Sequence, residues 1–127
     1  MRIALDTNRY SALAKGDQAL AVQLEAATVV FLPFVVVAEL RAGFAVGARG
    51  AANERSLALF LQQPGVSVLW PGEATLVVYA GLYRQLRAQG TPIPTNDLWI
   101  GALTIEHGLV LLSDDDHFRH LPQISRR

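Results

Sequence analysis

The stretch "RIALDTNRYSALA", residues 2–14, decides the fold because it joins a strand pattern to a helix pattern at a single acid. Residues 2–6 are a short apolar run ending on Asp6, and the apolar spacing after them suits a helix. A strand that leads directly into a helix is the repeating unit of parallel α/β sheets. The stretch therefore predicts a first strand with Asp6 at its carboxyl end.

The same alternation continues along the chain. We expect helix caps at Asp17, at Thr95 or Asn96, and at Gly90 and Gly108, and a flexible loop over 47–53. Further strands are predicted over 28–33, 66–70 and 109–113, and further helices over 18–27, 34–47, 52–63, 73–90 and 94–108. The pattern predicts one α/β domain with a mostly parallel sheet covered on both faces.

Composition narrows the classes of function. Eleven basic residues balance eleven acidic ones, so no global positive field marks the chain as a nucleic-acid binder. Cysteine is absent, which excludes disulfides, thiolate nucleophiles and thiolate metal sites. Apolar residues make up 51% of the chain, enough to leave apolar surface for a partner. With no signal-peptide or membrane-span pattern, we expect a cytoplasmic protein.

Acids gather where the predicted strands end, which is where ligands bind in such sheets. Asp6 ends the first strand, and Asp97 falls in the first turn of a helix, where it could also serve as a capping acid. Glu39 lies in an apolar helical stretch, where a charge is costly unless it pairs, for example with Arg41, or binds metal.

Glycines and one further acid refine this set. Gly43 and Gly101 each follow a candidate acid, Glu39 and Asp97, by four residues, and we expect them to leave both carboxylates uncovered. Glu106 follows Asp97 by nine residues, which turns it half a revolution away around the helix. We therefore expect Glu106 to be a structural or solvated acid.

Three consecutive aspartates, Asp114, Asp115 and Asp116, follow the last long strand. They could form a solvated turn that caps a short helix, or one of them could bind a cation. In an extended chain alternate residues point to opposite sides. Asp115 is therefore expected to part from its two neighbours.

Four acids in their sequence contexts resemble one known family. They are Asp6 in "LDTN", Glu39 in "VVVAELRAG", Asp97 in "IPTNDLWIGALTIEHG" and Asp115 in "LLSDDDHF". From its first strand to its last, the chain resembles the PIN-domain ribonucleases, and most closely the VapC toxins of bacterial toxin–antitoxin pairs. The resemblance implies a single PIN domain over residues 1–127, a three-layer α/β/α sandwich, and these four acids as catalytic ligands of Mg²⁺ or Mn²⁺ for cutting RNA.

The resemblance also assigns supporting residues. Asp115 matches the fourth, more variable acid of the family, and Ser113 stands where threonine is usual. Thr7 and Asn8 match polar positions that often orient the first acid or a bound water. Gly101 stands where alanine is more usual, which weakens a specific requirement for this glycine.

The implied partners are an RNA substrate, a VapB-type antitoxin whose C-terminal segment covers the site, and a second copy of the chain. Promoter DNA would be bound only through the antitoxin. Arg9 and Arg41 are candidates to contact RNA phosphates or acids of the antitoxin, as are Arg84 and Arg87.

The histidines receive lesser roles. His117 and His120 lie beside the acid triplet, and an imidazole there could bind metal or shuttle protons. The resemblance gives neither a catalytic part, so we expect packing or solvated roles. His107 is expected to serve the helix end.

Other classes fit less well. A haloacid-dehalogenase-like phosphatase normally needs a second aspartate where Asn8 stands and a lysine at mid-chain, whereas Lys15 is the only lysine. An aspartic protease would need glycine after "DT". A degenerate PIN-like module that binds RNA or protein without cutting remains the alternative function, and a cleavage assay with metal would discriminate it.

Overall fold

The structure, a computed structural model, describes all of residues 1–127, and its centre is a five-stranded sheet in the order β3-β2-β1-β4-β5. Every neighbouring pair of strands is parallel, so the predicted "mostly parallel" sheet is entirely parallel. The elements in chain order are β1 (Arg2–Leu5), α1 (Thr7–Ala14), α2 (Gln18–Glu25), β2 (Val29–Pro33), α3 (Phe34–Val46), α4 (Gly50–Leu61), β3 (Val66–Leu69), α5 (Glu73–Gln89), α6 (Thr95–Glu106), β4 (Val110–Leu112), the short 3-10 helix η1 (Asp116–His120) and β5 (Ser125–Arg126).

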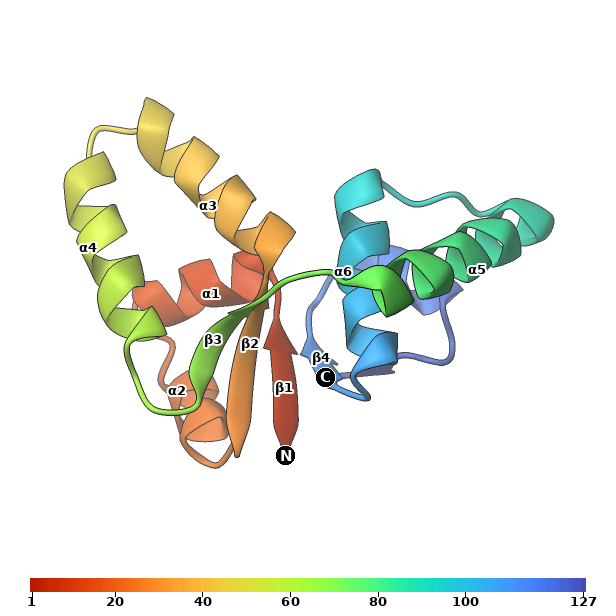
Figure 1. The fold of residues 1–127 in the computed structure, drawn as a ribbon. Coiled ribbons are helices and arrows are strands. Elements are labelled where there is room, and N and C mark those ends of the chain that lie inside the picture. The colour runs from red at the N-terminus through yellow and green to blue at the C-terminus, as the bar shows by residue number, and fades with distance from the viewer.

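The strand order reverses beside β1. The chain steps outward from β1 to β2 and β3, then crosses back to place β4 on the other side of β1. In Figure 1, α1 to α4 lie on one side of the strands, and α5 and α6 lie on the other. The fold is thus the expected three-layer α/β/α sandwich. A reversal of strand order opens a crevice at the carboxyl ends of the strands involved, here β1 and β4.

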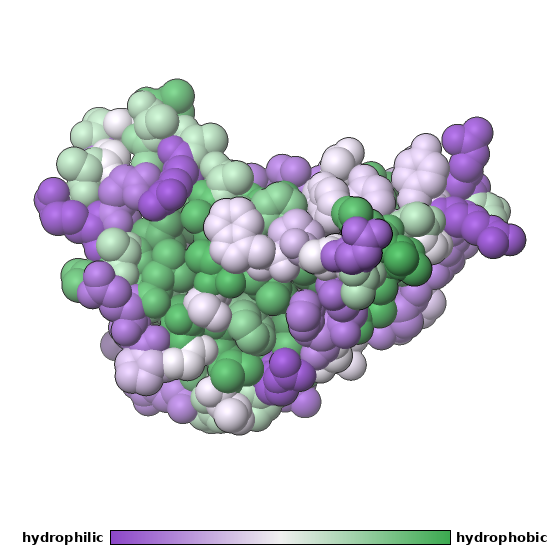
Figure 2. All heavy atoms as spheres, viewed as in Figure 1, coloured by the Kyte–Doolittle hydropathy of each residue, from purple (hydrophilic) through white to green (hydrophobic).

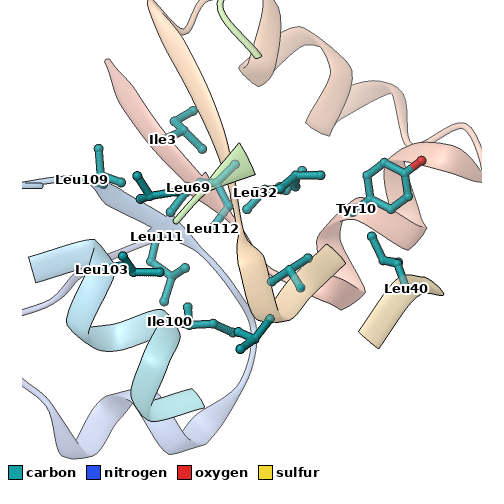
Figure 3. Close-up of a cluster of buried hydrophobic side chains, with 14 of the residues drawn as sticks. Ile3, Tyr10, Leu32, Leu40, Leu69, Ile100, Leu103, Leu109, Leu111 and Leu112 are labelled. Carbon is teal, nitrogen blue, oxygen red and sulfur yellow. The ribbon is translucent and has the colours of Figure 1, made fainter. Parts of the chain in front are cut away.

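Apolar side chains fix β1 and β4 at the centre. Ile3, Leu5, Leu111 and Leu112 are fully buried, and α6 contributes Leu103 to the same cluster (Figure 3). A strand covered on both faces needs apolar residues at successive positions, which is why "RIAL" and "VLL" read as continuous apolar runs. None of the helices combines the length and apolarity needed to span a bilayer.

Most predicted helix boundaries are confirmed, but three are wrong. The Asp17 carboxylate accepts from the Leu20 N–H at 3.0 Å as a cap, and Gly90 ends α5 with a positive φ of 70°. Helix α6 runs from Thr95 to Glu106: its N-cap residue is Pro94 rather than Thr95 or Asn96, and its C-cap is His107, one residue before the predicted Gly108. Proline's restricted φ sets up the extended geometry that precedes a first turn.

The third wrong boundary concerns the loop predicted over 47–53. Helix α4 starts at Gly50, so only the first part of that stretch is a loop. The alanines that follow Gly50 favour helix, and the Asn53 N–H donates to the Arg49 carbonyl at 2.9 Å. The sequence pattern does not predict β5, whereas η1 is the short helix that the aspartate triplet was considered to cap.

The C-terminal residues close the sheet edge beside β4. The Arg127 N–H donates to the Leu111 carbonyl at 2.9 Å, and the Ser113 N–H donates to the Arg127 carbonyl at 3.0 Å. A two-residue strand has too little pattern to be recognised in a sequence, because period-2 alternation needs several residues. This edge fixes the segment that carries the aspartate triplet.

Gly101 does not have the role expected from its spacing. It is buried, and a Cβ there would lie 3.2 Å from Leu121 Cδ1 and 3.4 Å from Ile124 Cδ1. Its missing side chain therefore makes room for the C-terminal segment rather than exposing Asp97. Gly43 differs, because a Cβ there would meet nothing within 4 Å.

We expect Gly101→Val to lower the free energy of unfolding by about 1–3 kcal/mol, since overpacking a filled core costs this much. The matched variant Gly43→Val should stay within about 0.5 kcal/mol of wild type, because valine slightly exceeds glycine in helix propensity and meets no neighbour. Urea unfolding measures both. Equal losses in the two variants would contradict the packing role of Gly101.

Candidate acidic metal site at the carboxyl edge

Asp6 is the buried member of the site. It follows β1 directly, is 5% exposed, and caps α1 by accepting from the Arg9 N–H at 2.8 Å. Burial raises the pKa of Asp6 above its ordinary value, although hydrogen bonds from the Ser113 side chain and the Arg9 N–H oppose the shift. The strand-to-helix junction thus holds a carboxylate at the crevice in an environment that disfavours its negative charge.

Glu39 reaches the site from the second turn of α3. Its Oε1 accepts from Thr7 Oγ1 at 3.3 Å, and the predicted alternative partner, Arg41, pairs with Glu54 at 3.3 Å instead. Partial desolvation raises the pKa of Glu39, and the like charges of Asp97 and Asp6 add to the shift. Glu39 therefore has no basic partner and faces other acids.

Asp97, Asp115 and His117 form a compact cluster. His117 Nδ1 lies 2.8 Å from Asp97 Oδ2 and 3.0 Å from Asp115 Oδ1, and the three atoms lie within 4.8 Å of one another. Burial raises the pKa of Asp97, with a further rise from the charges of Asp115 and Asp6. The hydrogen bond to Asp97 in turn raises the pKa of His117.

Asp115 parts from its two neighbours in the triplet, as the sequence predicted. Asp114 is exposed and accepts from Arg9 Nη2 at 2.8 Å. Asp115 caps η1 by accepting from the His117 N–H at 2.9 Å, and Asp116 is exposed in the first turn of η1. Their repulsion is thus offset by an arginine, by N–H groups and by solvent.

The three predicted supporting residues, Ser113, Thr7 and Asn8, differ in what they contact. Ser113 is buried, contacts Asp6, and accepts from the Asp115 N–H at 3.0 Å, so it links two of the acids. Thr7 was expected to orient the first acid or a water, but it donates to Glu39 instead. Asn8 is exposed, and its supporting role stays a prediction.

Residues expected to lie outside the site do so. Glu106 Oε2 accepts from the buried Thr75 hydroxyl at 2.5 Å, which ties the end of α6 to the start of α5. His107 is the C-cap residue of α6, and its carbonyl accepts from Arg2 Nη1 at 2.9 Å. Glu106 is therefore the structural acid predicted from its helical position.

His117 is the residue that the sequence analysis placed wrongly. It was assigned a packing or solvated role, yet its ring lies between two of the candidate acids. The local signal was the "DDH" spacing, because a cap at Asp115 turns the chain so that a side chain two residues later folds back over it. Its contact with Asp97, twenty residues earlier, has no signature in the local sequence.

The donor set fits a divalent cation. Asp6, Glu39 and Asp97 all have raised pKa values, and like charge contributes to each shift. A bound cation removes that repulsion, and carboxylate oxygens are the ligands that Mg²⁺ and Mn²⁺ prefer. Arg9 pairs with Asp114 and lies 3.4 Å from the Arg127 carbonyl, and its charge also lowers the pKa of Asp6, so it offsets only part of the repulsion among these acids.

Comparison with known proteins agrees with the observed fold. The family model described as "PIN domain" matches residues 3–124 of this chain. Among curated proteins, Ribonuclease VapC4 of Mycobacterium tuberculosis is 30% identical over 90 residues, which cover 71% of this chain and 69% of that protein.

Two solved structures match the whole chain. VapBC-1 from nontypeable Haemophilus influenzae superposes with a TM-score of 0.89 at 26% identity, covering 100% of this chain and 97% of that chain. VapBC2 from Rickettsia felis, solved bound to a DNA fragment from the promoter of its genes, superposes with a TM-score of 0.88 at 23% identity. The match covers 100% of this chain and 98% of that chain. At 23% identity, the likeness to the Rickettsia felis structure shows a shared fold.

The raised pKa of Asp6 predicts how stability depends on pH without metal. A carboxyl whose pKa is higher in the folded state than in the unfolded state stabilises the fold below its ordinary pKa, and this contribution is lost as pH rises through the folded value. Asp6→Asn keeps a capping side chain and removes the titration. In EDTA, its Tm relative to wild type should therefore be higher near about pH 8 than near about pH 4.

Thermal melts over this pH range measure the difference between the two proteins. If the Tm difference between Asp6→Asn and wild type does not change with pH, it contradicts the pKa rise that burial is expected to cause at Asp6.

Proposed function

Because this chain belongs to the PIN-domain family, we propose that it is a divalent-metal-dependent endoribonuclease and the toxin component of a toxin–antitoxin pair. The observation that carries the proposal is the meeting of acids from four separate parts of the chain at one edge of the sheet. Ribonuclease VapC4, which shares 30% identity, supports the same activity.

The proposed chemistry is hydrolysis of RNA phosphodiesters. Mg²⁺ or Mn²⁺ held by carboxylates supplies charge neutralisation at the phosphate and an activated water. Asp6, Glu39 and Asp97 are proposed to hold the metal, with Asp115 as a further ligand or as the group that orients the attacking water. In this scheme Ser113 fixes Asp6 relative to Asp115, and Thr7 fixes Glu39.

The charge pattern limits how RNA is held. The net charge is zero, so phosphate contacts must come from individual arginines near the site. Both predicted arginines pair with an acid, Arg41 with Glu54 and Arg9 with Asp114, but the Arg41 side chain is 62% exposed and that of Arg9 only 22%. Arg41 is therefore the better-placed of the two predicted contacts to RNA or to acids of an antitoxin, and Arg9 acts chiefly within the protein.

The alternative is a degenerate PIN-like module that binds RNA or protein without cutting. All four acid positions are occupied, and each of Asp6, Glu39 and Asp97 has a raised pKa that a cation would lower. A module that had lost catalysis would have no need to keep this costly arrangement of like charges. The proposal of an active nuclease follows from that cost.

A VapB-type antitoxin is the proposed protein partner. A groove of about 580 Å³ runs between α1, α2 and α4, with an apolar lining that includes Tyr10, Leu24, Leu59 and Phe60. An apolar segment of a partner would bury this lining. Figure 2 shows apolar surface gathered over the region where α3, α4 and β3 lie in Figure 1, as expected from the 51% apolar composition.

The remaining assignments are a homodimer, contact with promoter DNA only through the antitoxin, and a cytoplasmic location. Trp70, Val77 and Tyr83 support self-association, since they are 68%, 71% and 54% exposed around α5. The zero net charge supports an indirect contact with DNA.

We expect Asp6→Asn and Asp97→Asn each to lower the rate of RNA cleavage by about 100-fold or more, since metal-assisted charge stabilisation supplies several kcal/mol. Asp115→Asn, which retains the cap of η1, should also lower it, whereas Asp116→Asn should cleave at the wild-type rate. Cleavage of a mixed RNA pool by the antitoxin-free protein, with Mg²⁺ or Mn²⁺, measures all four. Undiminished cleavage by Asp6→Asn and Asp97→Asn would refute the metal site.

The groove proposal predicts that Leu59→Arg weakens binding of the cognate antitoxin by about tenfold or more, because a charge replaces a buried apolar contact. Leu59 is 65% exposed in this chain, so the variant should fold normally. Val46→Arg is the matched control, since Val46 is 90% exposed and does not line the groove. Calorimetry measures both affinities, and equal binding by the two variants would exclude the groove.

A further inference from the structure

We propose that His117 is a direct ligand of the metal and biases the site toward Mn²⁺ over Mg²⁺. The inference rests on the proposed function, which requires a divalent cation, and adds a nitrogen donor to a site otherwise made of carboxylates. Its starting observation is that His117 Nδ1 lies 2.8 Å from Asp97 Oδ2 and 3.0 Å from Asp115 Oδ1.

These separations suit ligands of one ion. In an octahedral site with metal–ligand distances of 2.0–2.1 Å, two ligands at right angles lie about 2.9 Å apart, and two opposite ligands about 4 Å apart. Nδ1 is at right-angle spacing from both oxygens, and all three atoms lie within 4.8 Å of one another. The donor atoms therefore need little movement to share a cation.

The backbone holds the imidazole in this position. Asp115 accepts from the His117 N–H at 2.9 Å, and its own carbonyl accepts from Arg126 Nη1 at 2.6 Å. Asp97 is placed independently, in the first turn of α6. The ring is thus fixed from one side by the cap of η1 and meets an acid from a separate helix, α6.

The nitrogen donor changes which cation is preferred. Mg²⁺ takes oxygen ligands and gives up water reluctantly, whereas imidazole suits transition metals, and Mn²⁺ also accepts carboxylates. A set of aspartates with one histidine therefore favours Mn²⁺ over Mg²⁺ more than the aspartates alone would. His120 provides an internal comparison, since it lies three residues away and is not part of the cluster.

A competing account makes His117 a clamp that only hydrogen-bonds the two acids and must be displaced by the metal. The two accounts predict opposite effects of His117→Ala. If His117 is a ligand, the Kd for Mn²⁺ rises about tenfold or more, while the Kd for Mg²⁺ changes less. If His117 is a clamp, removing it leaves Mn²⁺ affinity unchanged or increases it.

Electron spin-echo measurements on the full chain loaded with Mn²⁺ alone test ligation directly, without an activity assay. We expect ¹⁴N modulation from a directly bound imidazole, replaced by ¹⁵N modulation when the chain is labelled with ¹⁵N-histidine. The modulation should vanish in His117→Ala and persist in His120→Ala. The comparison of labelled with unlabelled protein uses the wild-type chain, so it does not depend on whether His117→Ala folds.

The possible results test the ligand role of His117 separately from the proposed ribonuclease function. Bound Mn²⁺ with no nitrogen modulation, or modulation that persists in His117→Ala, overturns the ligand role of His117 and leaves the ribonuclease proposal standing. Failure of the wild-type chain to bind Mn²⁺ at all overturns both. Tighter Mn²⁺ binding by His117→Ala supports the clamp and overturns the ligand role.

Discussion

The rest of the structure depends on the parallel pairing of β1 with β4, which holds mutually repelling acids at the point where the strand order reverses. Asp6 ends β1, and the aspartate triplet follows β4, the strand that pairs with it. The apolar residues of these two strands fix the separation of the acids, so the carboxylates cannot move apart without disrupting the core. The stability of the sheet is therefore the source of the strained electrostatics at its edge, and a cation relieves that strain without any change in the fold.

Much of the fold could be predicted from the sequence because its signals are local. The apolar runs of β1 and β4, the carboxylate cap at Asp17 and the glycine at the end of α5 each lie within a few residues of what they determine. Gly101 shows the limit of such reasoning. Its spacing from Asp97 suggested an open carboxylate, but its real constraint is the approach of Leu121 and Ile124, which only the folded chain brings near.

The site divides in the same way. Asp6, Glu39 and Asp97 could be singled out from the sequence because strand ends and apolar surroundings make an acid conspicuous, whereas Asp115 was chosen from the triplet through the family resemblance. His117 was considered but assigned a packing or solvated role, because its contact with Asp97 of α6 has no signature in the local sequence. Thr7 and Arg9 show that a correct position does not ensure a correct partner: Thr7 bonds Glu39 and Arg9 bonds Asp114, and both pairings are long-range.

The placement of β4 beside β1 has a consequence for biosynthesis. Residues near the two ends of the chain, such as Ile3 and Val110, are register partners, and the final backbone bonds of the edge involve Arg127. Asp115 and His117 therefore reach Asp6 only after nearly the whole chain is available to fold. A chain in which β4 has not yet been synthesised therefore lacks part of the acid cluster.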